Sequence, residues 1–123
     1  MKELLVDSSI LIDFFQGSLD AETKRLLENR NSSFSAISYF EVCKFFYNVG
    51  KTAELVFVKQ KLDSMHYFHL TGEICFAAAK ISHSIGLSMA DSIIYTTARL
   101  NDCDLVTSDS DLKGKPGVLF VKK

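Results

Sequence analysis

The stretch LLVDSSILIDFF, residues 4–15, contains the pattern from which the fold of the chain can be inferred. Its opening apolar run predicts a short buried β-strand over residues 3–6. Asp7 follows at the C-terminal end of this strand, directly before the start of a predicted helix. A carboxylate beside a buried strand is costly unless it has a partner, so Asp7 requires an explanation beyond packing.

Helices and short strands alternate along the whole chain. The first helix is expected over about residues 9–15, with Ser8 or Ser9 as its N-cap, and Gly17 ends it. Strands separated by helices predict a parallel sheet covered on both faces, so we expect a three-layer α/β/α sandwich. Further helices are expected at residues 20–30, 38–50, 52–64, 71–84 and 88–100, and strands or extended segments at 33–38, 66–70, 105–107 and 118–121.

The composition is that of one globular domain, residues 1–123. With 47% hydrophobic residues, the chain can build a core and is too apolar for a disordered protein. No uncharged apolar run approaches the roughly 18 residues of a membrane span, and MKELLVDSS lacks the apolar core of a secretory signal. A cytoplasmic location is therefore expected. The three cysteines form no C-x-x-C pair, which favours free thiols over a zinc site.

Several acids occupy the ends of predicted strands. Asp7 follows the first strand, and Asp109 and Asp111 in LVTSDSDLKG follow a later one. Because the carboxyl ends of parallel strands meet at one edge of a sheet, where ligands bind in α/β folds, these acids are expected to lie close together.

Two further acids lie near the starts of predicted helices. Ser38 precedes Glu41, and Ser88 precedes Asp91, each by three residues, which fits the capping-box pattern. Both acids, however, stand inside apolar stretches, ISYFEVCKFF and LSMADSIIY, where a carboxylate needs a positive partner. Capping and ligand binding both remain open from the pattern alone.

No lysine or arginine is placed to neutralise all of these acids. A hard divalent cation would do so, and Mg²⁺ and Mn²⁺ favour carboxylate oxygens. We therefore interpret Asp7 as a metal ligand at a strand end, with its neighbouring serines as hydrogen-bond donors.

Four segments of the sequence together resemble the PIN domain family, and within it the short toxins of VapBC toxin–antitoxin pairs. The resemblance covers essentially the whole chain. Its diagnostic segment is GLSMADSIIYTTARL, and Leu112 departs from the phenylalanine that is more common in the family. The segments are LLVDSSILIDFF, ISYFEVCKFF, GLSMADSIIYTTARL and DLVTSDSDLKG.

The resemblance implies a PIN-like fold and a metal-dependent endoribonuclease. One or two Mg²⁺ or Mn²⁺ ions would activate water for hydrolysis of an RNA phosphodiester bond. Asp109 is favoured over Asp111 as the fourth ligand, although family members use either position, and Asp111 is then a supporting residue together with Ser9 and Thr107. The implied catalytic metal ligands are Asp7, Glu41, Asp91 and Asp109.

The charge distribution is compatible with an RNA substrate. The net charge is −1, but without the five acids discussed above 10 acids remain for 14 bases. Basic residues near the acids could contact the RNA backbone, although they could equally be ordinary solvated side chains. The candidates are Lys44, Arg99, Lys113 and Lys115.

The helix at residues 38–50 is apolar on almost all sides, and the helix at residues 52–64 adds four consecutive apolar residues, 55–58. Both features indicate a thick core or a protein interface. The resemblance implies a homodimer and a cognate antitoxin bound over these helices. The alternatives are a PIN scaffold in RNA processing and a catalytically silent protein-binding module. A phospho-acceptor receiver domain fits poorly, because a single acid, Asp7, follows the first strand.

Overall fold

A five-stranded parallel sheet forms the centre of the molecule. The computed structural model describes residues 2–123, and its strands follow the order β3-β2-β1-β4-β5. The expected parallel sheet is therefore confirmed, with the first strand of the sequence in its middle. The strands are β1 (Leu4–Val6), β2 (Ser32–Ser35), β3 (His66–Phe68), β4 (Asp104–Thr107) and β5 (Val118–Phe120).

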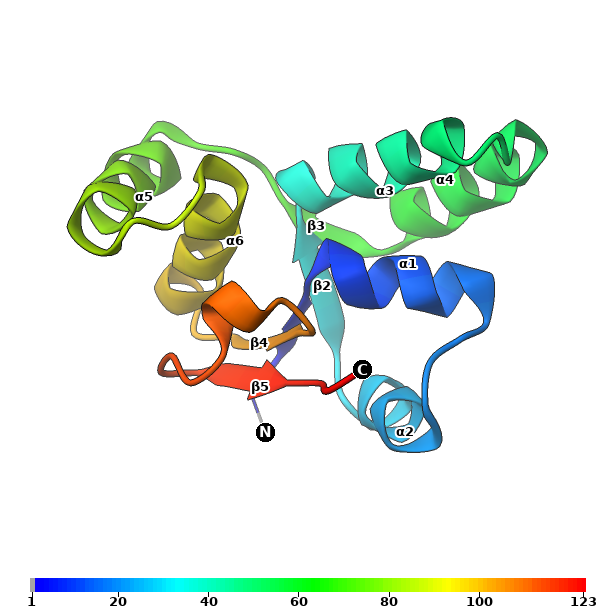
Figure 1. The fold of residues 1–123 in the computed structure, drawn as a ribbon, viewed down its shortest axis with the longest axis horizontal. Helices are drawn as coiled ribbons and strands as arrows, with labels where there is room; N and C mark the ends of the chain where they lie inside the picture. The colour runs from blue at the N-terminus through cyan, green and yellow to red at the C-terminus, as the bar shows by residue number, and fades with distance from the viewer. Residues whose placement is uncertain (1) are drawn as a thin grey trace.

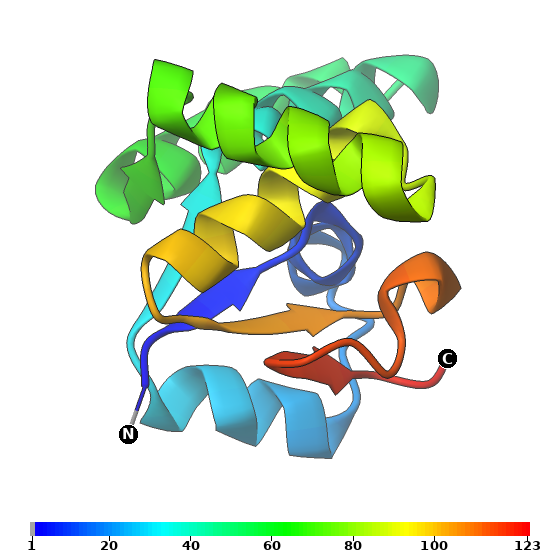
Figure 2. The same ribbon diagram turned by 90° about the vertical axis from the view of Figure 1, so that its left-hand side faces the viewer.

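Helices cover both faces of this sheet, which confirms the three-layer architecture. Figure 1 shows α5 and α6 on one side and α1, α3 and α4 on the other, and Figure 2 shows α6 lying across the sheet. No helix within residues 2–123 has the length and apolar character needed to cross a membrane. The helices are α1 (Ser8–Gln16), α2 (Ala21–Asn29), α3 (Ala36–Asn48), α4 (Leu55–Ser64), α5 (Gly72–Ile85) and α6 (Met89–Leu100), with 3₁₀ turns η1 (Thr52–Glu54) and η2 (Ser110–Leu112).

The two faces of the sheet are buried by alternate residues of the same strands. Leu4 and Val6 belong to the core beneath α1, α3 and α4, whereas Leu5 belongs to the core beneath α6. Successive side chains of a strand point to opposite faces, so an uninterrupted apolar run is required where both faces are covered. This explains why residues 4–6 contain no polar side chain.

The register of the central strands brings two loops to the same edge of the sheet. Val6 of β1 pairs with Val106 of β4, and the Asp7 N–H donates to the Val106 carbonyl at 3.0 Å. Asp7 therefore leaves the sheet beside Thr107, the last residue of β4. The residues at the ends of the first and fourth strands, Asp7 and Thr107, therefore lie side by side, although they are about a hundred residues apart in sequence.

The start of α1 differs from the prediction. The helix begins at Ser8, and its N-cap is Asp7, whose carboxylate accepts the Ser8 N–H, rather than Ser8 or Ser9. Aspartate is as good an N-cap as serine. Asp7 therefore ends the strand and caps the following helix with the same side chain.

The start of α3 was also predicted wrongly. Ser35, not Ser38, is the N-cap, and its hydroxyl accepts the Ile37 N–H at 3.2 Å. Glu41 is consequently the sixth residue of the helix, so the capping-box explanation of this acid is wrong. At α6 the expected cap is present, because the Ser88 hydroxyl accepts the Asp91 N–H at 3.2 Å.

The two candidate caps of α3 should respond differently to replacement by alanine. Ser35→Ala removes an N-cap and is expected to cost about 1 kcal/mol of unfolding free energy, or roughly 4 °C in Tm. Ser38 is fully buried, and its hydroxyl has no hydrogen-bond partner among residues 2–123, so Ser38→Ala should leave Tm unchanged or slightly higher. Thermal denaturation of both variants distinguishes them, and a larger loss in Ser38→Ala would contradict the assignment.

Candidate metal centre

Asp7 is the most buried carboxylate of the site, with 4% of its surface exposed. One of its oxygens, Oδ1, accepts the Ser8 N–H at 2.8 Å, and the other, Oδ2, accepts the Thr107 hydroxyl at 2.5 Å. The Ser9 hydroxyl also donates to Oδ2, at 3.3 Å. These donors fix the carboxylate in one orientation without neutralising its charge.

Hydroxyl groups connect Asp7 to the loop that follows β4. The Thr107 hydroxyl, which donates to Asp7, accepts the Asp109 N–H at 3.0 Å. The Ser9 hydroxyl similarly accepts the Ser108 N–H at 3.3 Å. The predicted supporting positions of Ser9 and Thr107 thus correspond to hydrogen bonds that join the first strand end to the fourth.

Glu41 reaches the same region from the middle of α3. Its Oε1 accepts the Ser8 hydroxyl at 3.0 Å, a contact between residues 33 positions apart. The sequence predicts Ser8 as a candidate helix cap and as a hydrogen-bond donor near Asp7, but it does not identify Glu41 as the acceptor. The two serines after Asp7 are the sequence signal for such a contact. That pattern does not specify which acid each hydroxyl binds.

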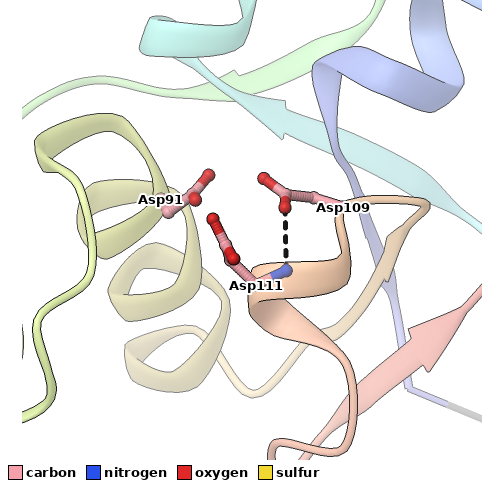
Figure 3. Close-up of side chains that lie close together, drawn as sticks. All are labelled: Asp91, Asp109 and Asp111. Carbon is pink, nitrogen blue, oxygen red and sulfur yellow. Dashed lines mark hydrogen bonds between the residues drawn. The ribbon is translucent and has the colours of Figure 1, made fainter.

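Asp91, Asp109 and Asp111 form the tightest acidic cluster. Each contributes a carboxylate oxygen, and these oxygens lie within 4.8 Å of one another. Figure 3 shows Asp91 on α6 facing the two acids of the loop after β4, with the Asp111 N–H donating to Asp109. Asp111, expected in a supporting role, lies in the same cluster as Asp109, so the choice between them as a ligand stays a prediction.

The carboxylates raise one another's affinity for protons. Burial raises the pKa of Asp91 to about 7, and the charge of Asp109 adds to the effect. Burial also raises the pKa of Asp7, with a smaller contribution from Asp109. For Glu41, burial raises the pKa, Ser8 opposes the shift, and Asp7 and Asp109 increase it. Acids from four segments therefore lie within electrostatic reach of one another.

No ion pair relieves this concentration of charge. Within residues 2–123, the lysine and arginine salt bridges involve Asp13, Asp63, Asp102 and Asp104, and none reaches an acid of the site. A set of carboxylates without a basic partner matches the all-oxygen preference of Mg²⁺ and Mn²⁺. The residues therefore fit a divalent cation.

The four basic residues suggested for RNA occupy different positions. Lys44 Nζ lies 6.0 Å from the centre of the Phe40 ring, and Lys113 Nζ lies 5.1 Å from that of Phe120. Arg99 is eight residues after Asp91 on α6, about 12 Å along the helix. Its guanidinium lies against Gly117, where an added Cβ would come within 2.3 Å of it. Arg99 thus lies at the opposite end of α6 from Asp91.

Lys115 is half-buried in the turn between η2 and β5. Its N–H donates to the Leu112 carbonyl at 3.3 Å, and Leu112 is itself fully buried. This backbone anchoring keeps the turn close to the loop that contains Asp109 and Asp111. The family departure at Leu112 is accommodated as an apolar core contact.

Comparison with known proteins agrees with this architecture. The family model described as PIN domain matches residues 4–117. A solved structure described as a toxin–antitoxin complex from Klebsiella pneumoniae is similar, with 27% identity, a TM-score of 0.77 and coverage of 95% of each chain. No curated protein sequence matches the chain.

Two more distant structures share the fold. PAE2754 from Pyrobaculum aerophilum has 17% identity and a TM-score of 0.78, covering 97% of this chain and 89% of that chain. Mycobacterium tuberculosis VapC20, described as a sarcin-ricin loop cleaving toxin, has 16% identity and a TM-score of 0.73, covering 89% and 92%. At these identities the likeness concerns the fold.

The metal-free protein should lose stability as pH rises. The unfolded chain releases the Asp91 proton near its ordinary pKa of 3.8, whereas the folded chain keeps it to about 7. The stabilising contribution is therefore complete at low pH and disappears between these values. Between pH 5 and 8 in EDTA we expect a loss on the order of 1 kcal/mol, discounted for the partial exposure of Asp91.

Thermal denaturation of the wild type and of Asp91→Asn across this pH range measures the effect. The neutral amide cannot titrate, so Asp91→Asn should reduce the pH dependence, whereas Glu28→Gln at an exposed position of α2 should not. A Tm that rises with pH in the wild type would contradict the raised pKa values.

Proposed function

The chain belongs to the PIN domain family, and from this premise we propose that it is a metal-dependent endoribonuclease acting as the toxin of a type II toxin–antitoxin pair. The observation that carries the proposal is the convergence of acids from β1, α3, α6 and the loop after β4 without a basic partner among residues 2–123. The similar Klebsiella pneumoniae structure described as a toxin–antitoxin complex supports it. Such a toxin would act on RNA in the cytoplasm.

Asp7, Glu41, Asp91 and Asp109 would hold Mg²⁺ or Mn²⁺, with Asp111 as the alternative to Asp109. When bound, such an ion polarises a phosphate and lowers the pKa of water. Asp7 supplies a fixed carboxylate, because Thr107 and the Ser8 N–H orient it.

The Asp91 side chain is more exposed than that of Asp7. Its pKa of about 7 means that the metal-free site retains part of a proton near neutral pH, which reduces repulsion among the acids. Because a cation binds the deprotonated carboxylate, it competes with this proton. Affinity for the ion is therefore expected to increase with pH through the neutral range.

Basic side chains beside the acids would hold the substrate. We assign contacts with the RNA backbone first to Lys113 and Lys115 in the loop that follows η2. Lys44 on α3 lines the apolar groove described below and would contact RNA only while no protein partner covers that groove. Arg99 would reach only nucleotides away from the cleavage point, because it lies at the far end of α6. Phosphate neutralisation by these cations would offset the repulsion between RNA and the acids.

The surface of α3 and α4 supports the proposed protein partners. Phe40, Tyr47, Val56 and Phe57 are each more than 60% exposed. A groove of about 630 Å³ runs along α3 and β3, with Tyr39, Phe40 and Tyr67 among its walls. Apolar patches of this kind mark interfaces, and we assign this surface to a second copy of the chain and to the antitoxin.

RNA cleavage should depend on the buried acids and on the cation. With Mn²⁺ or Mg²⁺, wild-type protein is expected to cut defined single-stranded and hairpin RNAs, and EDTA should stop the reaction. Asp7→Asn or Asp91→Asn should reduce the rate by more than about 100-fold, the upper end for losing a mere supporting contact of a metal site.

Asp102→Asn is the matched control, because that side chain is 83% exposed and lies outside the acidic site. Circular dichroism of each variant verifies that the fold persists. Full activity in Asp91→Asn would contradict the assignment. Binding of Mn²⁺ without any RNA cleavage would instead indicate a catalytically silent binding module.

Self-association should require the exposed apolar side chains of α3 and α4, which include Tyr47 and Phe57. At micromolar concentration, light scattering after size exclusion is expected to show a dimer for the wild type and a monomer for Tyr47→Glu/Phe57→Glu, since charges would be buried in the interface. Leu100→Glu, at an exposed apolar position of α6, is the control. A wild type that is strictly monomeric would contradict the dimer.

A further inference from the structure

We infer that Ser8 is a positioning residue that holds the Glu41 carboxylate in place for the divalent cation, an inference that rests on the proposed function. Ser8 is the first residue of α1, and Glu41 lies in the middle of α3. Their side chains meet at the edge of the sheet where β1 ends. Ser8 therefore joins two helices at the point where the acids converge.

Two different groups of Ser8 contact two different carboxylates. Its backbone N–H donates to Asp7 Oδ1 at 2.8 Å, and its hydroxyl donates to Glu41 Oε1 at 3.0 Å. The same hydroxyl lies 3.4 Å from Asp7 Oδ1, so its single proton is directed mainly to Glu41. Replacing the side chain would therefore remove the contact with Glu41 and leave the backbone contact with Asp7.

The two acids depend on Ser8 to very different degrees. Asp7 also accepts hydrogen bonds from the hydroxyls of Ser9 and Thr107. For Glu41, the Ser8 hydroxyl is the one hydrogen-bond donor found among residues 2–123. Asp7 is therefore held redundantly, whereas a single contact orients Glu41.

Glu41 needs such a contact because its neighbours repel it. The negative charges of Asp7 and Asp109 both act on its carboxylate. Glutamate has a longer and more flexible side chain than aspartate, and freezing it costs conformational entropy. Without the Ser8 hydroxyl, the carboxylate is free to turn away from the other acids, and the cation would have to bring it back on binding.

Calorimetric titration with MnCl₂ of the full chain tests this role without requiring RNA. Ser8→Ala is expected to weaken Mn²⁺ binding about tenfold, the usual cost of losing a supporting contact in a metal site. Ser8→Thr keeps the hydroxyl and should stay within about twofold of the wild type. Ser84→Ala, at an exposed position of α5, should have no effect.

Comparison with Ser9→Ala tests whether Asp7, which has several hydrogen-bond donors, tolerates the loss of one better than Glu41 does. Because Thr107 and the Ser8 N–H continue to hold Asp7, Ser9→Ala should weaken Mn²⁺ binding less than Ser8→Ala does. Ser9→Ala also removes the acceptor of the Ser108 N–H, so the deciding comparison is the order of the Glu41 side chain. An equal loss of that order in Ser9→Ala would overturn the inference that Glu41 depends on the Ser8 hydroxyl.

A double-mutant cycle tests whether Ser8 acts through Glu41. If it does, Ser8→Ala should cause no further loss of Mn²⁺ affinity in the Glu41→Gln background, so the two effects are not additive. Additive losses would overturn the inference, because they would show that Ser8 contributes through another group.

The side-chain order parameter of Glu41, measured by NMR in the metal-free protein, gives a second readout. It should fall in Ser8→Ala and recover in Ser8→Thr. Normal Mn²⁺ binding by the wild type with no response in Ser8→Ala overturns the inference alone. A wild type that neither binds Mn²⁺ nor cuts RNA overturns the proposed function and with it the role of Ser8 toward the ion.

Discussion

The structure depends above all on the burial of the Asp7 carboxylate between β1 and α1. This side chain ends the central strand, caps the helix that follows and accepts the hydroxyl of Thr107 from the neighbouring strand. A buried charge is tolerated only where donors surround it. Those donors come from the start of α1 and the end of β4, so the same requirement that satisfies Asp7 also aligns the segments that form the site.

Repulsion among the acids is the second constraint. Each of Asp7, Glu41 and Asp91 has its pKa raised by burial and by the charge of Asp109 or Asp7, and no lysine or arginine within residues 2–123 compensates. A protein can relieve such repulsion with protons or with a cation. In this interpretation the repelling acids make the folded, metal-free protein less stable at neutral pH, and the same acids give it affinity for a divalent ion.

At α3 the local sequence pattern identified Glu41 as a candidate site residue but predicted the start of its helix wrongly. A serine three residues before Glu41 has the spacing of a capping box, yet the helix begins one turn earlier at the cap Ser35. Both positions carry serine, a residue that favours an N-cap, but the helix that follows β2 begins directly after Ser35. At α6 Ser88 is the N-cap as expected, because Gly86 ends the preceding helix and the Ser88 hydroxyl accepts the Asp91 N–H.

The order of helices and strands, the parallel sheet and the presence of acids at strand ends could be predicted from the sequence, because they follow from apolar runs, caps and glycines that act over a few residues. The contact of Ser8 with Glu41, the grouping of Asp111 with Asp91 and Asp109, and the position of the Arg99 guanidinium against Gly117 could be seen only in the folded structure. These relations depend on strand register and helix packing, and such distances between remote segments leave no periodic trace in the sequence.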